Sequence, residues 1–300
     1  MERLCDSLML HCQRTTKGYT MTKYIFILIL FGLGLQANSV DDALASAKAG
    51  HFATAEKLLT QACARGDIRG CYKLGVMYDR GQGLPQNDKT AVRLYRKACD
   101  GGNANGCFNL GMMYEKGRGV QQDYRGAAHH YKRACDKGDT WGCASLGVMY
   151  YDGRGVRKDY TAAVKLYQKS CDGGYAPGCS NLGLMYVYRQ GVEGNDTRAI
   201  TLFRKSCEGG FAMGCTNLGV MYDRGRGIEQ DAATAVKLFE RACREGNAPG
   251  CSNLGVMYEE GRGVQRNTVM ARRFFDRACE MGDRSRCTNR MESEHDKEER

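Results

Sequence analysis

The sequence has little of the residue types that build sheets, metal sites and nucleic-acid surfaces. It contains three prolines, five histidines and one tryptophan in 300 residues. No stretch alternates apolar and polar residues as a half-buried strand would. There is no nucleotide-binding fingerprint and no motif that interleaves aromatic and basic residues. We therefore expect an all-α protein that does not bind nucleic acid.

The motifs of common hydrolases are also missing. A serine β-lactamase needs Ser-x-x-Lys, Ser-Asp-Asn and Lys-Thr-Gly, and none of the three occurs. His129 and His130 are the only adjacent histidines. On a helix they would point about 100° apart, so they would not chelate one metal. We interpret them as a surface pair, expect no metal or other cofactor, and leave the catalytic residues unknown.

Cysteine, by contrast, is abundant and periodic. Of 16 cysteines, Cys5 and Cys12 lie near the start, and the others form pairs of residues eight positions apart. Each pair begins 36 residues after the previous one, and a fixed period of this size is typical of a solenoid. The pairs are Cys63 with Cys71, Cys99 with Cys107, Cys135 with Cys143, Cys171 with Cys179, Cys207 with Cys215, Cys243 with Cys251, and Cys279 with Cys287.

The segment Cys171-Asp-Gly-Gly-Tyr-Ala-Pro-Gly-Cys179 suggests how each pair is used. Zinc ligands usually stand two to four residues apart, so disulfides are favoured over a metal site or free thiols. In one straight helix the two Cα atoms would lie about 12 Å apart, whereas a disulfide needs less than about 7 Å. The chain must reverse between them, and adjacent pairing is preferred, although a Cys71–Cys99 bridge at one end of a helix hairpin stays possible.

Each period contains two helices. In residues 107–142, apolar residues at helical spacing predict a first helix that ends at Gly117, and Asp123 predicts the cap of a second helix. A glycine recurs inside each first helix, which indicates close helix contact. The fold class is an α/α superhelical solenoid of disulfide-bridged helix pairs. Its expected parts are an N-terminal pair within 39–70, six repeats (71–106, 107–142, 143–178, 179–214, 215–250, 251–286), and a capping helix end with an acidic tail at 287–300.

The start of the chain predicts export. Lys23 precedes the apolar run 25–35 and small residues follow it, which is typical of a signal peptide, here 21–38. The run is short for a membrane span, although a signal anchor stays open. Residues 1–20 then form an upstream extension. We expect a secreted or periplasmic protein with no stable membrane span after cleavage, where disulfides persist.

The repeat motif GCFNLGMMYEKGRGV followed by DYRGAAHHYKRACDKG resembles the Sel-1-like repeat, a relative of the tetratricopeptide repeat. The bridged Cys-x7-Cys spacing is similar to that of the Helicobacter cysteine-rich protein family, over about residues 40–290. That resemblance implies exported, disulfide-bridged α/α repeats. Members carry the label of β-lactamase, with weak penicillin binding or hydrolysis, and are also viewed as secreted adaptors.

One polar position recurs on the expected concave face of the first helices. In tetratricopeptide domains the matching asparagine often bonds a bound peptide, and the alternative is an exposed position that tolerates substitution. An amide side chain can donate and accept, which suits a peptide bond. Loss of Asn181 and Asn217 together is expected to weaken ligand binding without lowering thermal stability. The candidate residues are Lys73, Asn109, Ser145, Asn181, Asn217 and Asn253, with Asn289 at the same register near the end.

The net charge limits the choice of binding partners slightly. The net charge is +10, and loss of the four basic and two acidic residues in 1–37 leaves +8. A basic body favours anionic partners. We expect a monomer that binds a peptide, a protein, or a small molecule of the peptidoglycan or β-lactam type; the alternative is a host-interaction or wall-binding protein without enzyme activity. In repeat 179–214, Arg189 replaces a turn glycine, so this turn is expected to differ in shape.

Overall fold

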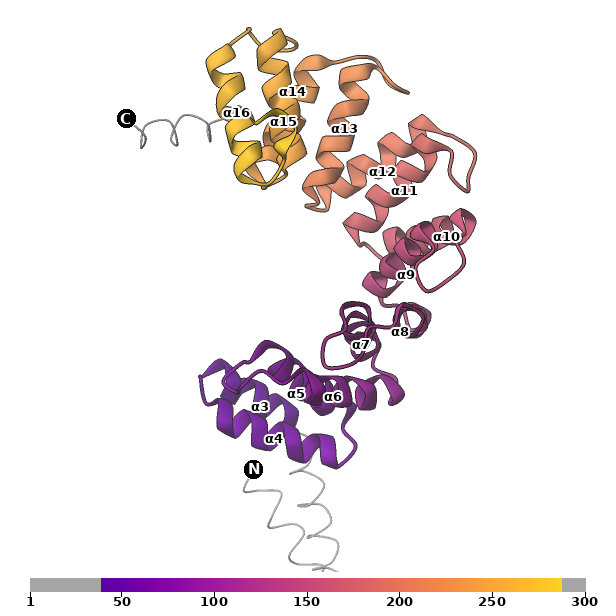
Figure 1. Ribbon diagram of the computed structural model, residues 1–300, viewed down its shortest axis with the longest axis vertical. Coiled ribbons are helices and arrows are strands. Elements are labelled where there is room, and N and C mark those ends of the chain that lie inside the picture. Colours follow the sequence, from indigo (N-terminus) through magenta and orange to yellow (C-terminus); the bar gives the residue numbers. More distant parts are fainter. Residues whose placement is uncertain (1–38, 288–300) are drawn as a thin grey trace, which may run out of the picture. The chain divides into compact units, whose positions relative to one another are not determined.

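Figure 1 shows the computed structural model of the chain, which describes residues 39–287. Some of the sequence-based predictions fall on residues outside this range. They are the upstream extension, the signal peptide, Cys5 and Cys12, Asn289 and the acidic tail.

The all-α prediction is confirmed, because residues 39–287 form α-helices and one short 3-10 helix and contain no strand. The expected first pair of helices is present as α3 and α4. The helices are α3 (Ser39–Lys48), α4 (Phe52–Ala64), α5 (Ile68–Arg80), α6 (Asp88–Asp100), α7 (Ala104–Lys116), α8 (Tyr124–Asp136), α9 (Thr140–Asp152), α10 (Tyr160–Asp172), α11 (Ala176–Tyr188), α12 (Asp196–Glu208), α13 (Ala212–Arg224), α14 (Ala232–Arg244), α15 (Ala248–Glu260), α16 (Thr268–Glu280) and η1 (Arg284–Arg286).

The chain divides into two compact units, one ending at Asn87 and the other beginning at Asp88. The first unit contains α3, α4 and α5, and the second contains α6 to α16 with η1. Within each unit, helices that follow one another in sequence pack together, as Figure 1 shows for the second unit. We call α5, α7, α9, α11, α13 and α15 the first helices, and α6, α8, α10, α12, α14 and α16 the second helices.

In the second unit, a glycine in each first helix lets the following second helix approach closely. A Cβ atom added at Gly183 would lie 2.6 Å from the ring of Phe203, and one at Gly147 would lie 2.7 Å from the ring of Tyr167. Any larger residue would collide with the ring. Contact with a buried aromatic ring therefore offsets the roughly 1 kcal/mol that glycine costs inside a helix.

The turn after each first helix is the same in all repeats of the second unit. Gly117 ends α7 in the left-handed conformation with φ of 67°, as predicted, and Asp123 caps α8 by accepting from the Arg125 amide. Arg189 ends α11 with φ of 57° and ψ of 38°. The prediction that this turn would differ in shape is therefore wrong: the arginine adopts the conformation that glycine adopts elsewhere.

Each of the first six disulfides joins the end of one helix to the start of the next, and the seventh joins the end of α16 to Cys287, which follows η1. All seven bridges have the adjacent pairing that the sequence favours, so the alternative bridge between Cys71 and Cys99 does not form. The bridges are Cys63–Cys71, Cys99–Cys107, Cys135–Cys143, Cys171–Cys179, Cys207–Cys215, Cys243–Cys251 and Cys279–Cys287.

The geometry of the bridges follows from the reversal of the chain between the paired cysteines. The two Cα atoms lie 4.5 Å apart in six of the bridges and 5.6 Å apart in the last one. The chain reverses through a left-handed glycine such as Gly174, whose φ is 88°. The cysteines of the first six bridges, among them Cys107, Cys143 and Cys215, are buried, so the solvent reaches these bridges poorly.

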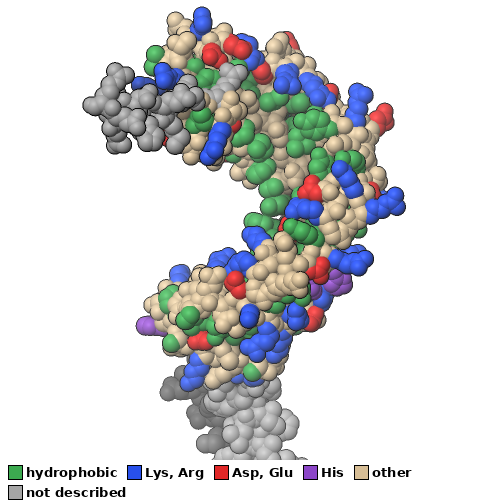
Figure 2. All heavy atoms as spheres, viewed as in Figure 1, with side chains coloured by type: hydrophobic (Ala, Val, Ile, Leu, Met, Phe, Trp, Pro, Cys, Tyr) green, Lys and Arg blue, Asp and Glu red, His purple; other side chains and the backbone are tan. Residues whose placement is uncertain are grey.

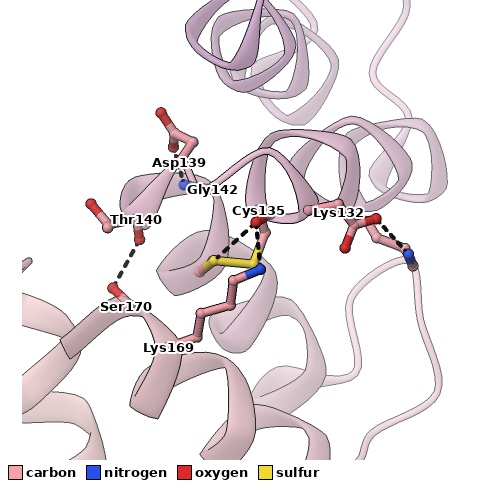
Figure 3. Close-up of a disulfide and its surroundings, with 9 residues drawn as sticks. Lys132, Cys135, Asp139, Thr140, Gly142, Lys169 and Ser170 are labelled. Atoms are coloured by element: carbon pink, nitrogen blue, oxygen red, sulfur yellow. Dashed lines mark hydrogen bonds and ion pairs between the residues drawn. A yellow bond between two sulfur atoms is a disulfide. The ribbon is translucent and has the colours of Figure 1, made fainter. Parts of the chain in front are cut away.

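At several of the disulfide-linked turns, a basic side chain from the next repeat donates a hydrogen bond to the carbonyl of the first cysteine. Figure 3 shows the Lys169 ammonium donating to the Cys135 carbonyl at 2.7 Å, and the Ser170 hydroxyl donating to the Thr140 carbonyl at 2.8 Å. Lys205 and Arg241 donate in the same way to the carbonyls of Cys171 and Cys207. A cation at the end of a helix satisfies unpaired carbonyls and interacts favourably with the helix dipole. These contacts link the second helices α10, α12 and α14 each to the preceding second helix.

Candidate binding surface on the first helices

The predicted polar residues occupy one register of the first helices, and each of them is half-buried. Asn109, Ser145, Asn181, Asn217 and Asn253 lie in the second unit. Lys73 lies in the first unit, where its ammonium is 5.7 Å from the centroid of the Tyr72 ring. We call the surface of the second unit that carries this register, together with the residues three and seven positions further along each helix, the ladder face.

The other two registers of the ladder face give it an apolar floor and an exposed rim. Three residues after the polar position stand Val148, Leu184 and Val220, all half-buried, and seven after Asn181 stands Tyr188, with an exposed fraction of 64%. Residues three, four and seven apart share one side of a helix. Figure 2 shows hydrophobic side chains exposed where the surface over α11 and α13 is hollowed.

Two adjoining hollows lie on this face. The larger has a volume of about 290 Å³, between α9 and α11, with Tyr167 of α10 at its wall and Asn181 and Tyr188 among its lining residues. The smaller, of about 120 Å³, lies between α11 and α13 and includes Asn217 and Arg224. Leu184 and Tyr188 line both hollows and separate them. The larger hollow has the size expected for a single side chain or a small fragment of a ligand.

Neighbouring first helices are elsewhere linked by an ion pair. Arg154, in the loop after α9, pairs with Glu115 of α7 at 3.4 Å. Arg262, in the loop after α15, pairs with Asp223 of α13. In both pairs the arginine follows the acid by 39 residues.

The ion pair is absent at the two junctions where the hollows lie. At the same spacing, Tyr151 is matched with Gln190, and both line the larger hollow. Val187 is matched with Arg226, whose guanidinium donates to the Val187 carbonyl at 2.7 Å and pairs with Asp196. Both charged side chains are thus replaced at the first of these junctions and only the acid at the second, and an open surface lies there in the middle of the second unit.

The polar groups of the two hollows differ in their hydrogen bonds. Within residues 39–287, Asn181 has no hydrogen-bond partner, and neither do Asn109, Ser145 and Asn253. Asn217 donates to the Ser180 hydroxyl at 3.1 Å, and Ser180 is buried with an exposed fraction of 1%. Removing the Asn217 side chain would leave that hydroxyl without this hydrogen bond, which would lower the free energy of unfolding by about 1–3 kcal/mol. This gives a reason to expect that loss of Asn217 lowers stability, unlike the sequence-based expectation.

Burial controls the charge state of the tyrosine in the larger hollow. Burial raises the pKa of the Tyr167 phenol well above its usual range, and the nearby Asp152 and Tyr151 raise it further. The phenol is therefore neutral and can both donate and accept a hydrogen bond.

The two adjacent histidines lie away from this face, on α8. His129 is exposed, but His130 is half-buried and stacks on Tyr114 with ring centroids 5.2 Å apart. Its Nδ1 is buried and has no hydrogen-bond partner in the described part of the chain. The interpretation as a surface pair therefore holds for His129 only. Within residues 39–287, no group of three or more His, Cys, Asp or Glu side chains could hold a metal ion.

Sequence reasoning found only Asn181 among the residues that line the larger hollow, and it missed Tyr151, Tyr167, Tyr188 and Gln190 among others. A signal for two of them was present. Aligning the 36-residue periods shows acid at the position of Tyr151 in most repeats and arginine at the position of Gln190. The joint departure of both residues from the pattern marks the junction, but their proximity becomes visible only in the folded chain.

Comparison with known proteins supports the fold. Each helix in residues 39–287 is too short or too polar to span a membrane. Six Sel1 repeats match the chain, at residues 68–103, 104–139, 142–175, 176–211, 212–247 and 248–283. No curated protein matches it.

Several solved structures are similar. A Sel1 repeat protein from Oxalobacter formigenes is 30% identical with a TM-score of 0.74, over 80% of this chain and 99% of that protein. A protective antigen present in uropathogenic Escherichia coli strains, displaying an SLR fold, is 28% identical with a TM-score of 0.74, over 84% of this chain but 55% of the antigen. Helicobacter pylori cysteine-rich protein B is 35% identical over 42% of this chain and 96% of its own, with a TM-score of 0.35.

The chain therefore spans about 55% of the length of the E. coli antigen. The matched repeats cover more than half of the chain, follow one another along it, and each contains one first helix and the second helix that follows it. The chain belongs to the Sel1 repeat family.

Proposed function

We propose that this protein is a binding scaffold that holds a segment of another polypeptide along the ladder face, centred on the two hollows. The observation that carries the proposal is the combination of an open apolar floor with the unpartnered Asn181 carboxamide. Sel1 repeats are protein-interaction scaffolds, and repeat stacks generally use extended faces for binding.

The ladder face suits a polypeptide chain chemically. A peptide bond offers one donor and one acceptor, and a carboxamide can satisfy both. The apolar residues Val148, Leu184 and Val220 can cover side chains of the ligand. Binding in an extended form would leave successive side chains to neighbouring repeats.

We also propose that the protein works in an oxidising extracellular or periplasmic compartment. Seven disulfides in one chain support this proposal, because such bridges are rare in reducing cytosol. The residues outside 39–287 that suggest export add support from the sequence.

Penicillin hydrolysis, implied by the family resemblance, finds no support at these hollows. Neither is lined by serine, cysteine, lysine or histidine, so the pairing of a serine or cysteine nucleophile with a lysine or histidine base is missing from both hollows. Incubation of the oxidised protein with a chromogenic cephalosporin tests this directly. We expect no turnover.

The binding proposal is tested with an array of end-blocked peptides probed with the oxidised protein. Asn181→Ala is expected to reduce the affinity of bound peptides about two- to tenfold, since one hydrogen bond contributes about 0.5–1.5 kcal/mol. Its melting temperature should not fall, because this side chain has no partner within residues 39–287.

Thr161→Ala combined with Thr201→Ala provides the control, because both threonines are exposed on the second helices α10 and α12. This variant should bind peptides as the unmodified protein does. If Asn181→Ala and the control bind with equal affinity, the ladder face is not the binding surface.

A further inference from the structure

The Tyr167 hydroxyl is an unexplained polar group in the wall of the larger hollow. Tyr167 is buried, with an exposed fraction of 3%, and it lines the hollow. Within residues 39–287 its hydroxyl has no hydrogen-bond partner. The oxygen itself is not fully buried, so it faces the open hollow and not the closed interior. Because it bonds no atom within residues 39–287, the fold alone gives no reason to keep it.

Comparison with the neighbouring repeats shows that the hydroxyl is not needed for packing. One period earlier, Tyr131 donates to the Glu115 carboxylate at 2.6 Å. One period later, Phe203 takes the position, and the facing residue is Val187. A phenylalanine thus packs well where no acceptor faces the ring. At Tyr167 the facing residue is Tyr151, yet the hydroxyl is retained.

The surroundings of the hydroxyl define what could accept its hydrogen bond. The walls of the hollow are largely apolar, formed by Val148, Leu184, Met185 and the exposed Tyr188. No lysine or arginine lines it, and the Asp152 carboxylate at its edge is paired with Arg154 at 3.1 Å. A charged ligand group would lose hydration there without gaining a countercharge.

We propose that this hollow is the subsite for one large uncharged side chain of the bound polypeptide, a tyrosine, whose phenolic oxygen accepts a hydrogen bond from the Tyr167 hydroxyl. The inference rests on the proposed binding function and adds the ligand residue that is selected. The apolar walls cover the ligand ring, and the Tyr167 hydroxyl donates a hydrogen bond to the phenolic oxygen at the end of that ring. A ring that is well covered and one hydrogen bond at its end are together a typical anchor at protein interfaces.

The test uses pooled end-blocked nonapeptides with tyrosine, phenylalanine, lysine or glutamate fixed at the centre. Blocked ends exclude recognition of a terminal carboxylate. The unmodified protein is expected to retain the tyrosine pool most strongly. A single peptide from that pool and its phenylalanine twin are then titrated into the protein.

Tyr167→Phe separates the proposed hydrogen bond from packing. We expect this variant to bind the tyrosine peptide with about two- to tenfold lower affinity and the phenylalanine twin with unchanged affinity. Its melting temperature should stay the same or rise, because no hydrogen bond within residues 39–287 is lost. Tyr131→Phe is the matched control: it loses the bond to Glu115, so it should melt earlier while preserving the preference for tyrosine.

Equal affinity of the two twin peptides for the unmodified protein would overturn the inference. An equal loss of affinity for both peptides in Tyr167→Phe would also overturn it. If peptides bind, depend on Asn181 and show no preference at the centre, this inference fails while the binding proposal stands. If no pool binds at all, both fail.

Discussion

Arg189 keeps a backbone conformation that glycine provides at the same turn of neighbouring repeats. Its φ of 57° lies beside values of 61° at Gly225 and 72° at Gly261. A side chain in the left-handed region costs about 1–2 kcal/mol. Arg189 lies between Tyr188 and Gln190, which line the larger hollow, so the strained residue adjoins the proposed site.

Arg189→Gly should therefore raise the free energy of unfolding by about 1 kcal/mol, measured by urea denaturation of the oxidised protein. Gly225→Arg, which makes the reverse change at the equivalent turn, should lower it by a similar amount. No gain in Arg189→Gly would mean that the left-handed conformation carries no strain here.

His130 is expected to make the second unit sensitive to acid. Its pKa is lowered from 6.5 to about 4, mainly by burial and also by the charges of His129, Arg133 and Arg96, against a smaller opposing effect of Asp100. The folded protein thus prefers the neutral ring. Stability from this group is complete above pH 6.5 and is lost as the pH falls through about 4.

His130→Phe keeps a ring against Tyr114 and removes the titration. Its melting temperature relative to that of the unmodified protein should rise steadily between pH 6.5 and 4. His129→Gln, at an exposed position, should retain the acid-dependent loss. Parallel melting curves for His130→Phe and the unmodified protein over this range would contradict the account.

At the scale of helix pairs, the packing of glycine against an aromatic ring sets the distance between the two helices. A Cβ at position 183 would lie 2.6 Å from the Phe203 ring. Gly183→Ala should therefore lower the free energy of unfolding by about 1–3 kcal/mol, as overpacking does. Urea denaturation measures this loss.

Replacing the ring by a smaller side chain provides the control for this prediction. Phe203→Leu should cost less in the Gly183→Ala background than in the unmodified protein, because it relieves the collision. Strictly additive losses would mean that the two residues do not limit the approach of the helices.

The helix pairs were predictable from the sequence because each signal is local. Cysteine spacing, the glycine at each turn and the Asp or Asn caps recur every 36 residues, so the copies strengthen one another. The hollows were not predictable in this way. Tyr151 and Gln190 stand 39 residues apart and meet through the stacking of repeats, so a reading that treats one period at a time separates them.

At the scale of the whole molecule, an ion pair links neighbouring first helices at two junctions of the second unit, and the junctions α9–α11 and α11–α13 lack it. Glu115–Arg154 and Asp223–Arg262 represent the ordinary state. The junction of Tyr151 with Gln190 leaves an open apolar surface of the ladder face. The central claim is that this surface receives the ligand.

Tyr151→Glu combined with Gln190→Arg tests that claim most directly, because it restores the side chains that link the helices elsewhere in the chain. Isothermal titration with a peptide selected on the array compares this variant with the unmodified protein, and Tyr151→Phe serves as a control that keeps the surface apolar. The expected result is that the double variant folds with equal or greater stability and loses at least about tenfold in affinity, equivalent to about 1.4 kcal/mol, while Tyr151→Phe still binds. A double variant that folds and binds the peptide with unchanged affinity would contradict it.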